Sequence, residues 1–188
     1  MSIIILNGLP GTGKTTLANR LKEQLGYEYI SDWEILKDFN IDSFCGDRIS
    51  ISEKLSINLI SFILANKTKN LILDLDYSVM PNEMIEMKDD KYLTIYYLGF
   101  SGITKQKLIH AFKSKSCELN DLELVERIEY YLDISNFVKN ECNRYNLDFV
   151  GIGEDREEKL DNLFNKICKN HIWTIVDDFL LQTIFLLW

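Results

Sequence analysis

The stretch Asn7–Leu21, NGLPGTGKTTLANRL, decides the fold because glycines in it link an apolar run to an amphipathic one. The preceding β-branched run, Ser2–Leu6, is typical of a buried strand. After the glycines, leucines recur at every fourth position over Leu17–Leu25, which places them on one face of a helix. Gly26 then offers a helix C-cap. The stretch therefore predicts a strand, a tight loop and a helix in direct succession.

The loop has the spacing Gly-x-x-x-x-Gly-Lys-Thr, the complete P-loop pattern. Its glycines let backbone N–H groups turn toward phosphate oxygens, and the following helix N-terminus adds the positive end of its dipole. We expect Lys14 to reach the β- and γ-phosphates of ATP as a catalytic residue, and the Thr15 hydroxyl to coordinate Mg²⁺. The residues expected to bind ATP are Gly8, Leu9, Pro10, Gly11, Thr12, Gly13, Lys14, Thr15 and Thr16. The alternative is a glycine-rich turn that binds no ligand, but such a turn would not need every fixed residue of the P-loop pattern.

Length and composition limit the classes of protein to consider. The 188 residues suffice for one well-buried domain with a small lid. The formal net charge of −8 argues against a broad binding surface for DNA or RNA. None of the four cysteines forms a C-x-x-C pair, which favours reduced thiols in a cytoplasmic protein. The first strand starts at the N-terminus, so we expect no cleavable signal before it.

The C-terminal stretch 171–188, HIWTIVDDFLLQTIFLLW, is strongly apolar. Asp177 and Asp178 interrupt it, and the remaining apolar run is shorter than the ~18 residues of a membrane span. We therefore expect no membrane span. A helix packed on its own domain, a homodimer contact through this tail, and an exposed apolar surface all remain open.

Five short apolar runs alternate with helical patterns along residues 1–170. The expected strands are Ser2–Leu6, Tyr27–Ser31, Leu71–Asp76, Tyr92–Leu98 and Leu147–Ile152. Helical patterns follow the P-loop and occupy 47–67, 103–145 with a break near 114–120, and 154–169. This alternation predicts an α/β fold in three layers, with a five-stranded parallel sheet and helices on both faces. Ligands of such sheets bind beyond the carboxyl ends of the strands.

Asp32 stands at one such strand end. We expect its carboxylate to bind the acceptor, orient its hydroxyl and accept the proton as phosphoryl transfer proceeds. The alternative is an N-cap for a helix that begins at Trp33. Trp33 is expected to stack on the substrate, although an aromatic residue here is as often packing. Glu34 is the second candidate for the base.

Asp74 directly follows the apolar run Leu71–Leu73, which is typical of a Walker B strand. Its carboxylate is expected to serve Mg²⁺ opposite Thr15. Asp76 lies two residues on and shares the same strand face, so it remains the alternative metal residue.

The chain has only five arginines, and two of them are candidates for the site. Arg48 is expected on the acceptor side, and Arg127 as the catalytic cation of a lid-like helical segment near 103–130. That segment also carries Lys105, Lys107, Lys113 and Lys115. Ordinary surface ion pairs, such as one between Arg127 and Glu123, are the alternative. The loop Gly151–Asp155 borders the adenine or is a plain turn.

Together, GLPGTGKT (Gly8–Thr15), ISD (Ile30–Asp32) and LILDLD (Leu71–Asp76) resemble the P-loop small-molecule kinases. The resemblance is to the adenylate-kinase-like group, which includes nucleoside and shikimate kinases, and it covers most of 1–169. It implies a P-loop NTPase fold with an acceptor-binding segment after the second strand and a mobile lid after the fourth. It also implies ATP binding by Gly8–Thr16, a metal role for Asp74 and an acceptor role for Asp32.

The chain departs from adenylate kinases in two places. Those enzymes carry a Gly-Phe-Pro-Arg run after the aspartate of the third strand, whereas this chain continues LDYSVMPNEM over Leu75–Met84. Lysines and Arg127 replace the expected arginine-rich lid. A second phosphate-bearing substrate would need more arginine, so an uncharged hydroxyl acceptor such as a nucleoside fits better than a nucleoside monophosphate.

A GTPase is excluded by the residues around the third strand. Asp74 is not followed by a D-x-x-G switch, and Asn66-Lys67-Thr68 is followed by Lys69 in place of the aspartate that binds guanine. The sequence therefore predicts an ATP-dependent phosphotransferase that moves the γ-phosphate to a small hydroxyl-bearing acceptor. A regulatory protein that binds or hydrolyses ATP without an acceptor remains the alternative.

Overall fold

The computed structural model describes the chain except for residues 33, 36–47, 77–78, 114–120 and 186–188, and except for the side chains of 48–56 and 172–185. Five strands form one parallel sheet in the order β2-β3-β1-β4-β5. The strands are β1 (Ile3–Gly8), β2 (Glu28–Ser31), β3 (Leu71–Leu75), β4 (Leu93–Phe100) and β5 (Asp148–Ile152). The helices are α1 (Lys14–Leu25), α3 (Arg48–Ala65), α4 (Lys105–Lys113), α5 (Asp121–Tyr145) and α6 (Arg156–Phe185), with the short 3-10 helix η1 (Pro81–Met87).

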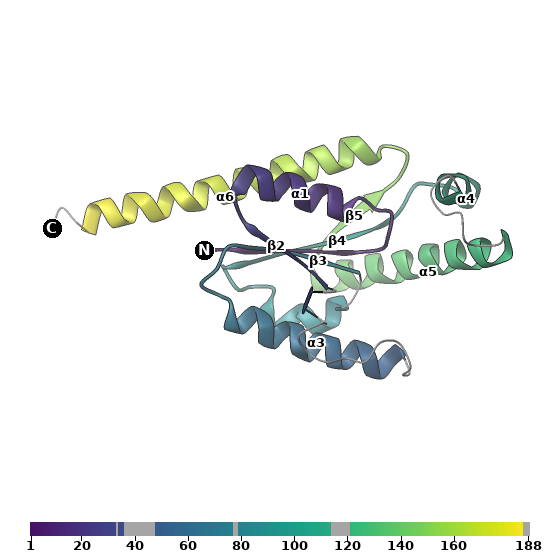
Figure 1. Cartoon of the computed structure of the whole chain (residues 1–188), viewed down its shortest axis with the longest axis horizontal. Helices are drawn as coiled ribbons and strands as arrows, with labels where there is room; N and C mark the ends of the chain where they lie inside the picture. The colour runs from purple at the N-terminus through teal and green to yellow at the C-terminus, as the bar shows by residue number, and fades with distance from the viewer. Residues whose placement is uncertain (33, 36–47, 77–78, 114–120, 186–188) are drawn as a thin grey trace.

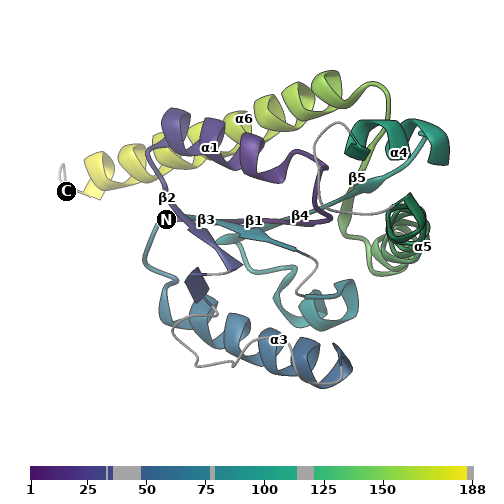
Figure 2. The same cartoon turned by 45° about the vertical axis from the view of Figure 1, so that its right-hand side comes forward.

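Helices cover both faces of the sheet, as the sequence predicts. In Figure 2, α1 and α6 lie on one face, and α3 lies on the other. Successive β1 side chains point to opposite faces, so Ile4 and Leu6 pack with α1 and α6, while Ile3 and Ile5 join the core beneath α3 and α5. All four isoleucine and leucine side chains are buried. The apolar run before the P-loop is therefore the centre of both cores.

The helix after the P-loop ends where its sequence predicts. Leu17 and Leu21 are fully buried, and Gly26 closes the helix with φ 69°. The Gly26 N–H donates to the Lys22 carbonyl at 2.9 Å, which satisfies one of the last carbonyls of α1.

Several elements differ from the expectation; β1, for example, continues past Leu6 to Gly8. The fourth strand does not end at Leu98: β4 continues through Gly99 to Phe100, because Gly99 pairs with Gly151 and Phe100 with Ile152 of β5. The 3-10 helix η1 was not expected, because its buried residues Pro81, Met84 and Met87 recur at every third position over only seven residues. It begins at Pro81, and the Glu83 carboxylate accepts from the Met80 N–H at 2.6 Å.

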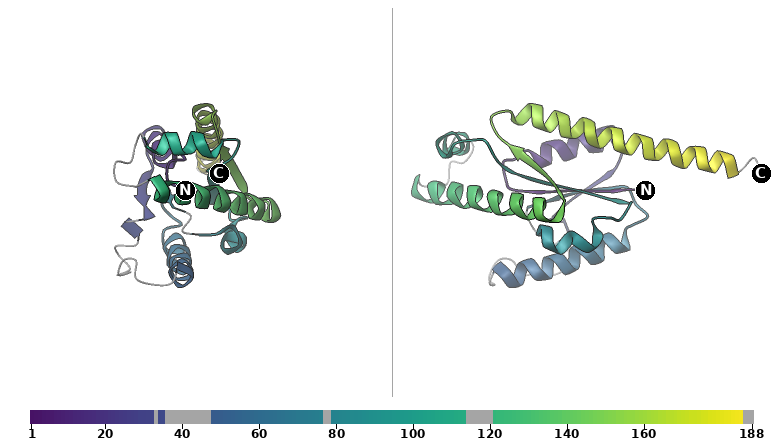
Figure 3. Two further views of the ribbon diagram at one scale, coloured as in Figure 1. Left: turned by 90° about the vertical axis from the view of Figure 1, so that its right-hand side faces the viewer. Right: turned by 180° about the vertical axis from the view of Figure 1, so that it is seen from behind.

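The last helix, α6, is continuous from Arg156 to Phe185 and extends past the end of the sheet (Figure 1 and Figure 3). Residues 171–185 of the apolar stretch are therefore a direct continuation of the helix that follows β5. His171 itself is buried against Tyr27, and burial lowers the pKa of its imidazole. Within the part of the chain that the structure describes, no helix is long and apolar enough to cross a membrane.

Candidate functional site

The strand order brings the P-loop and the predicted carboxylates to one edge of the sheet. β1, which leads into the P-loop, lies beside β3, and β3 lies beside β2. Leu6 of β1 and Ser31 of β2 are both in register with Asp74. Because all strands are parallel, the segments that follow them emerge at the same carboxyl edge.

Two glycines give the P-loop its shape. Gly11 and Gly13 have φ of 84° and 100°, in the left-handed region that other residues rarely adopt. There is also no room for a side chain. A Cβ at Gly13 would lie 2.6 Å from a methyl carbon of Leu160, and one at Gly11 would lie 2.7 Å from the ring of Phe112.

Lys14 is buried at the first turn of α1, and its ammonium group lies among oxygen atoms. The Nζ atom donates to Asp76 Oδ1 at 2.7 Å and to the Leu9 carbonyl at 3.2 Å, and lies 4.0 Å from Asp74 Oδ1. The Asp76 side chain is 53% exposed, whereas that of Asp74 is 8% exposed. Both carboxylates that the sequence leaves open for the metal therefore face the P-loop lysine.

Asp74 accepts two hydrogen bonds at one oxygen. The Thr15 hydroxyl donates to Oδ2 at 2.7 Å, and the Tyr29 hydroxyl of β2 donates to the same atom at 3.1 Å. Burial first, and then the negative charge of Asp74, raise the pKa of Tyr29 to about 12, so its phenol keeps the proton that it donates. Sequence reasoning missed Tyr29. A tyrosine hydroxyl on the strand before Asp32 indicates a candidate site residue, but only the pairing of β2 with β3 places this hydroxyl at Asp74.

Asp32 lies beside Asp76, since its Oδ2 accepts from the Asp76 backbone N–H at 3.3 Å. Glu34 instead turns back to its own strand, where Oε2 accepts from the Ser31 N–H at 2.8 Å and from the Ser31 hydroxyl at 3.2 Å. Asp32 is thus the acidic residue of this segment that reaches the cluster. Trp33 and the side chain of Arg48 lie outside the described residues.

The segment near 103–130 approaches the P-loop through α4. The Phe112 ring contacts Gly11 and also packs near the rings of Phe100 and Tyr131. The lysines of α4 form ion pairs. Lys107 Nζ lies 2.6 Å from Glu154 Oε1, Lys113 pairs with Asp121 at 2.7 Å, and Lys105 pairs with Glu129. Lys115 lies outside the described residues.

Arg127 is exposed on α5, one turn before Tyr131. Burial raises the pKa of Tyr131, the positive charge of Arg127 opposes that rise, and the negative charge of Asp76 adds to it. The Tyr131 phenol is therefore within electrostatic reach of both Arg127 and the carboxylate that pairs with Lys14.

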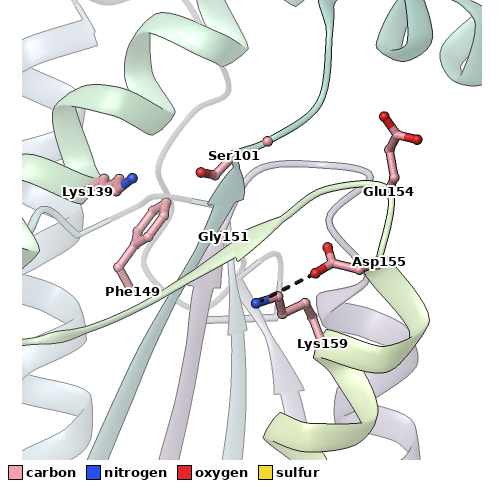
Figure 4. A pocket seen from close by; sticks show the side chains of 8 residues that line it. Ser101, Lys139, Phe149, Gly151, Glu154, Asp155 and Lys159 are labelled. Carbon is pink, nitrogen blue, oxygen red and sulfur yellow. Dashed lines mark ion pairs between the residues drawn. The ribbon is translucent and has the colours of Figure 1, made fainter.

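The loop after β5 has two sides. One side borders a pocket of ≈ 490 Å³ between α5 and α6, shown in Figure 4. The pocket is lined by Ser101, Gly102, Lys139, Phe149, Gly151, Glu154, Asp155 and Lys159. Asp155 and Lys159, which lie one turn apart at the N-terminal end of α6, pair at 3.6 Å on one side of this pocket (Figure 4). The other side meets the P-loop, where the Arg156 guanidinium contacts Gly13. Sequence reasoning did not select Arg156.

Taken together, a buried lysine, a threonine hydroxyl and two carboxylates gather beside a helix N-terminus. Such a set can bind a polyphosphate and balance the charge that phosphoryl transfer redistributes. A protein of Thermococcus onnurineus (strain NA1) named "Putative adenylate kinase" is 30% identical to this chain over 131 residues, which cover 68% of this chain and 69% of the relative. This chain belongs to the adenylate-kinase-like group of P-loop small-molecule kinases. The kinase is an ATP-dependent phosphotransferase that acts on a small substrate, as its sequence predicts.

Two further comparisons agree with this family. A "Cytidylate kinase" of Saccharolobus islandicus (strain L.S.2.15 / Lassen #1) is 32% identical to the kinase over 81 residues, covering 38% of this chain and 42% of the relative. The crystal structure of shikimate kinase from Bacteroides thetaiotaomicron covers 88% of the kinase and 98% of its own chain, with a TM-score of 0.55 and 16% identity, and so has the same fold. No protein-family model matches the chain.

Proposed function

We propose that the kinase transfers the γ-phosphoryl group of Mg·ATP to a nucleoside monophosphate. The observation that carries phosphoryl transfer is the cluster of Lys14, Thr15, Asp74 and Asp76 at the P-loop. The acceptor class is supported by the names of the relatives, an adenylate kinase and a cytidylate kinase, which both refer to nucleoside monophosphates.

The residues at the P-loop fit Mg²⁺. The Thr15 hydroxyl and the Asp74 carboxylate meet at 2.7 Å, and both are the hard oxygen ligands that Mg²⁺ prefers. Across the described ranges, no three His, Cys, Asp or Glu side chains gather to hold a metal by themselves. This agrees with a P-loop ion, which takes one or two protein ligands and completes its shell with phosphates and water. When bound, Mg²⁺ would neutralise charge on the β- and γ-phosphates.

Each residue of the cluster then has a distinct role. Lys14 leaves Asp76 and follows the negative charge on the transferred phosphoryl group. Thr15 and Asp74 would hold the metal, and Tyr29 keeps the Asp74 carboxylate in place through its hydrogen bond to Oδ2. Asp32 orients the acceptor, and with a hydroxyl acceptor it would also take the proton. Arg127 supplies a further cation from the lid-like segment near 103–130, in which Phe112 already contacts the P-loop.

A nucleoside is the second candidate acceptor. The sequence after Asp76 lacks the arginine that adenylate kinases carry there. Of the arginines with described side chains, Arg20 pairs with Asp161 at 2.8 Å and Arg144 lies 3.6 Å from Glu141, away from the P-loop cluster. A scarcity of arginine favours an acceptor without a phosphate of its own. The homodimer contact through 171–188 and the cytoplasmic location stay predictions.

Tyr29→Phe tests the metal role of Asp74. Removing one of the two hydrogen bonds to Oδ2 should loosen the carboxylate, so we expect the Mg²⁺ concentration for half-maximal rate to rise about three- to tenfold. Initial rates of ADP formation over a Mg²⁺ titration measure this shift. Tyr92→Phe, at an exposed tyrosine before β4, is the matched control. An unchanged Mg²⁺ requirement in Tyr29→Phe would contradict a positioning role for this phenol.

The acceptor is tested by ADP release from Mg·ATP with AMP, CMP, adenosine, cytidine, shikimate and gluconate. We expect a nucleoside monophosphate to stimulate release at least about tenfold over the rate without acceptor. Stimulation by nucleosides alone would replace the proposal with the second candidate. Hydrolysis indifferent to every acceptor would contradict both.

With the acceptor identified, Asp32→Asn should lower kcat about 100-fold and leave the ATP dissociation constant within about twofold, because Asp32 serves the acceptor and not ATP. Asp133→Asn, at an exposed position on α5, is the control for loss of one negative charge. Equal losses of ATP affinity and kcat in Asp32→Asn would place this residue on the ATP side of the site.

A further inference from the structure

The cluster around Lys14 gives the bound nucleotide a direction. In P-loops the lysine reaches the β- and γ-phosphates, and here Lys14 lies toward Asp74 and Asp76 on the β3 side of β1. The γ-phosphate end of ATP therefore lies toward β3. The α-phosphate and the nucleoside then lie toward β4 and β5, on the other side of β1.

Arg156 meets the P-loop from that second side. It is the first residue of α6, directly after the loop that follows β5. A Cβ built at Gly13 would lie 3.1 Å from Nη2 and 3.2 Å from Nε of Arg156. The guanidinium group thus lies against the P-loop backbone one residue before Lys14, beside the N-terminus of α1.

The Nε–H group of Arg156 lacks a partner that the fold could supply. Nε is buried and has no hydrogen bond among the described residues. The carboxylate oxygen Glu157 Oε1 lies 3.9 Å from Nε on a side chain that is 78% exposed, which makes a weak ion pair. The Arg156 side chain as a whole is 32% exposed, but a buried N–H of a charged group without an acceptor is still costly, so the position of Nε needs another explanation.

We propose that Arg156 binds the α-phosphate of ATP and ADP at the Gly13 side of the P-loop. The proposal rests on ATP use by this kinase and not on its acceptor. A nucleotide would bring the acceptor oxygens that Nε and Nη2 lack, and a planar guanidinium group can bind a phosphate through two parallel hydrogen bonds. Lys14 and Arg156 then hold the two ends of the triphosphate from opposite sides of the loop.

Arg20 is a matched control for Arg156, because its helix, α1, lies on the same face of the sheet as α6 (Figure 2). Its Nη1 pairs with Asp161 Oδ1 at 2.8 Å, and its guanidinium carbon lies 4.5 Å from the centre of the Phe164 ring. Arg20 thus contacts α6, to which Arg156 belongs. The protein itself provides the partners of Arg20, whereas Nε of Arg156 has no hydrogen-bond partner among the described residues. Loss of Arg20 should affect packing between α1 and α6 without affecting nucleotide affinity.

The test is calorimetric titration of the full chain with ADP and with adenosine, with no acceptor present. We expect Arg156→Ala to raise the ADP dissociation constant about 10- to 100-fold and the adenosine constant less than about twofold. Arg156→Lys should retain only part of the ADP affinity, because lysine keeps the positive charge but loses the two parallel hydrogen bonds of the guanidinium group. Arg20→Ala should leave both constants unchanged.

Two results would overturn the proposal. Unchanged ADP affinity in Arg156→Ala, with its fold verified by circular dichroism, would show that the guanidinium does not touch the nucleotide. Equal losses for ADP and adenosine, not restored in Arg156→Lys, would show a contact with the base in place of the phosphate. Neither result depends on the acceptor, so a failed search for kinase activity would leave this test intact.

Discussion

Lys14→Ala is expected to lower kcat about 100- to 1,000-fold, the range observed when one charge-stabilising donor is removed from an active site. Lys14 Nζ is the buried cation at the P-loop and lies 2.7 Å from Asp76 and 4.0 Å from Asp74. Without it, negative charge on the transferred phosphoryl group loses its nearest counter-charge. Initial rates of ADP formation with the identified acceptor, together with calorimetric ATP affinity, measure the effect.

Lys22→Ala is the control, because Lys22 is exposed on the same helix. It should match the wild type in both rate and affinity. The role of Lys14 would be contradicted by a Lys14→Ala protein that folds and turns over ATP within about tenfold of the wild-type rate. A loss of affinity with unchanged kcat would instead mean that Lys14 binds the ground state and the transition state equally.

Asp74→Asn is expected to lower kcat about 100-fold at millimolar Mg²⁺ and to raise the Mg²⁺ concentration needed for half-maximal rate at least about tenfold. The asparagine side chain keeps an oxygen for the Thr15 hydroxyl but loses the negative charge that attracts the metal. A Mg²⁺ titration of the rate at saturating ATP separates the two effects. Manganese, which accepts carboxylate and carbonyl ligands more readily, should restore part of the activity.

Asp148→Asn controls for the loss of one carboxylate. Asp148 is on β5, at the opposite edge of the sheet from β2, and it pairs with Lys166 of α6 at 3.0 Å. An Asp74→Asn enzyme with a normal Mg²⁺ requirement would transfer the metal role to Asp76. Asp76 is the alternative metal residue that the sequence leaves open, and its carboxylate accepts a hydrogen bond from Lys14.

The sheet was predictable because its signals are local. Each strand is a short apolar run between polar segments, and the P-loop spacing fixes which run is central. The end of β4 was not predictable, because a glycine usually ends a strand, and its pairing partner Gly151 lies far along the chain. The helix η1 is stabilised by Pro81 and the Glu83 cap, and its three-residue apolar repeat is too short to predict it.

The positions of Lys14 and Thr15 were predictable, because one segment carries both the motif and its geometry. Asp74 and Asp32 followed from the rule that parallel strands present ligands at their carboxyl ends. Tyr29 and Arg156 did not follow, since each acts through a contact with a distant segment, Asp74 and Gly13 respectively. The preference for Asp74 over Asp76 rested on the apolar run alone, and both carboxylates face the lysine.

The ion pair between Lys14 and Asp76 has a consequence for selectivity among anions. The lysine is already paired with a carboxylate of its own protein, so inorganic phosphate or sulfate would have to compete with that internal partner. A free anion gains the lysine only by leaving Asp76 unpaired. An anion that arrives with its own cation satisfies both groups at once. We therefore expect the P-loop to bind bare inorganic anions more weakly than an anion that carries its own cation.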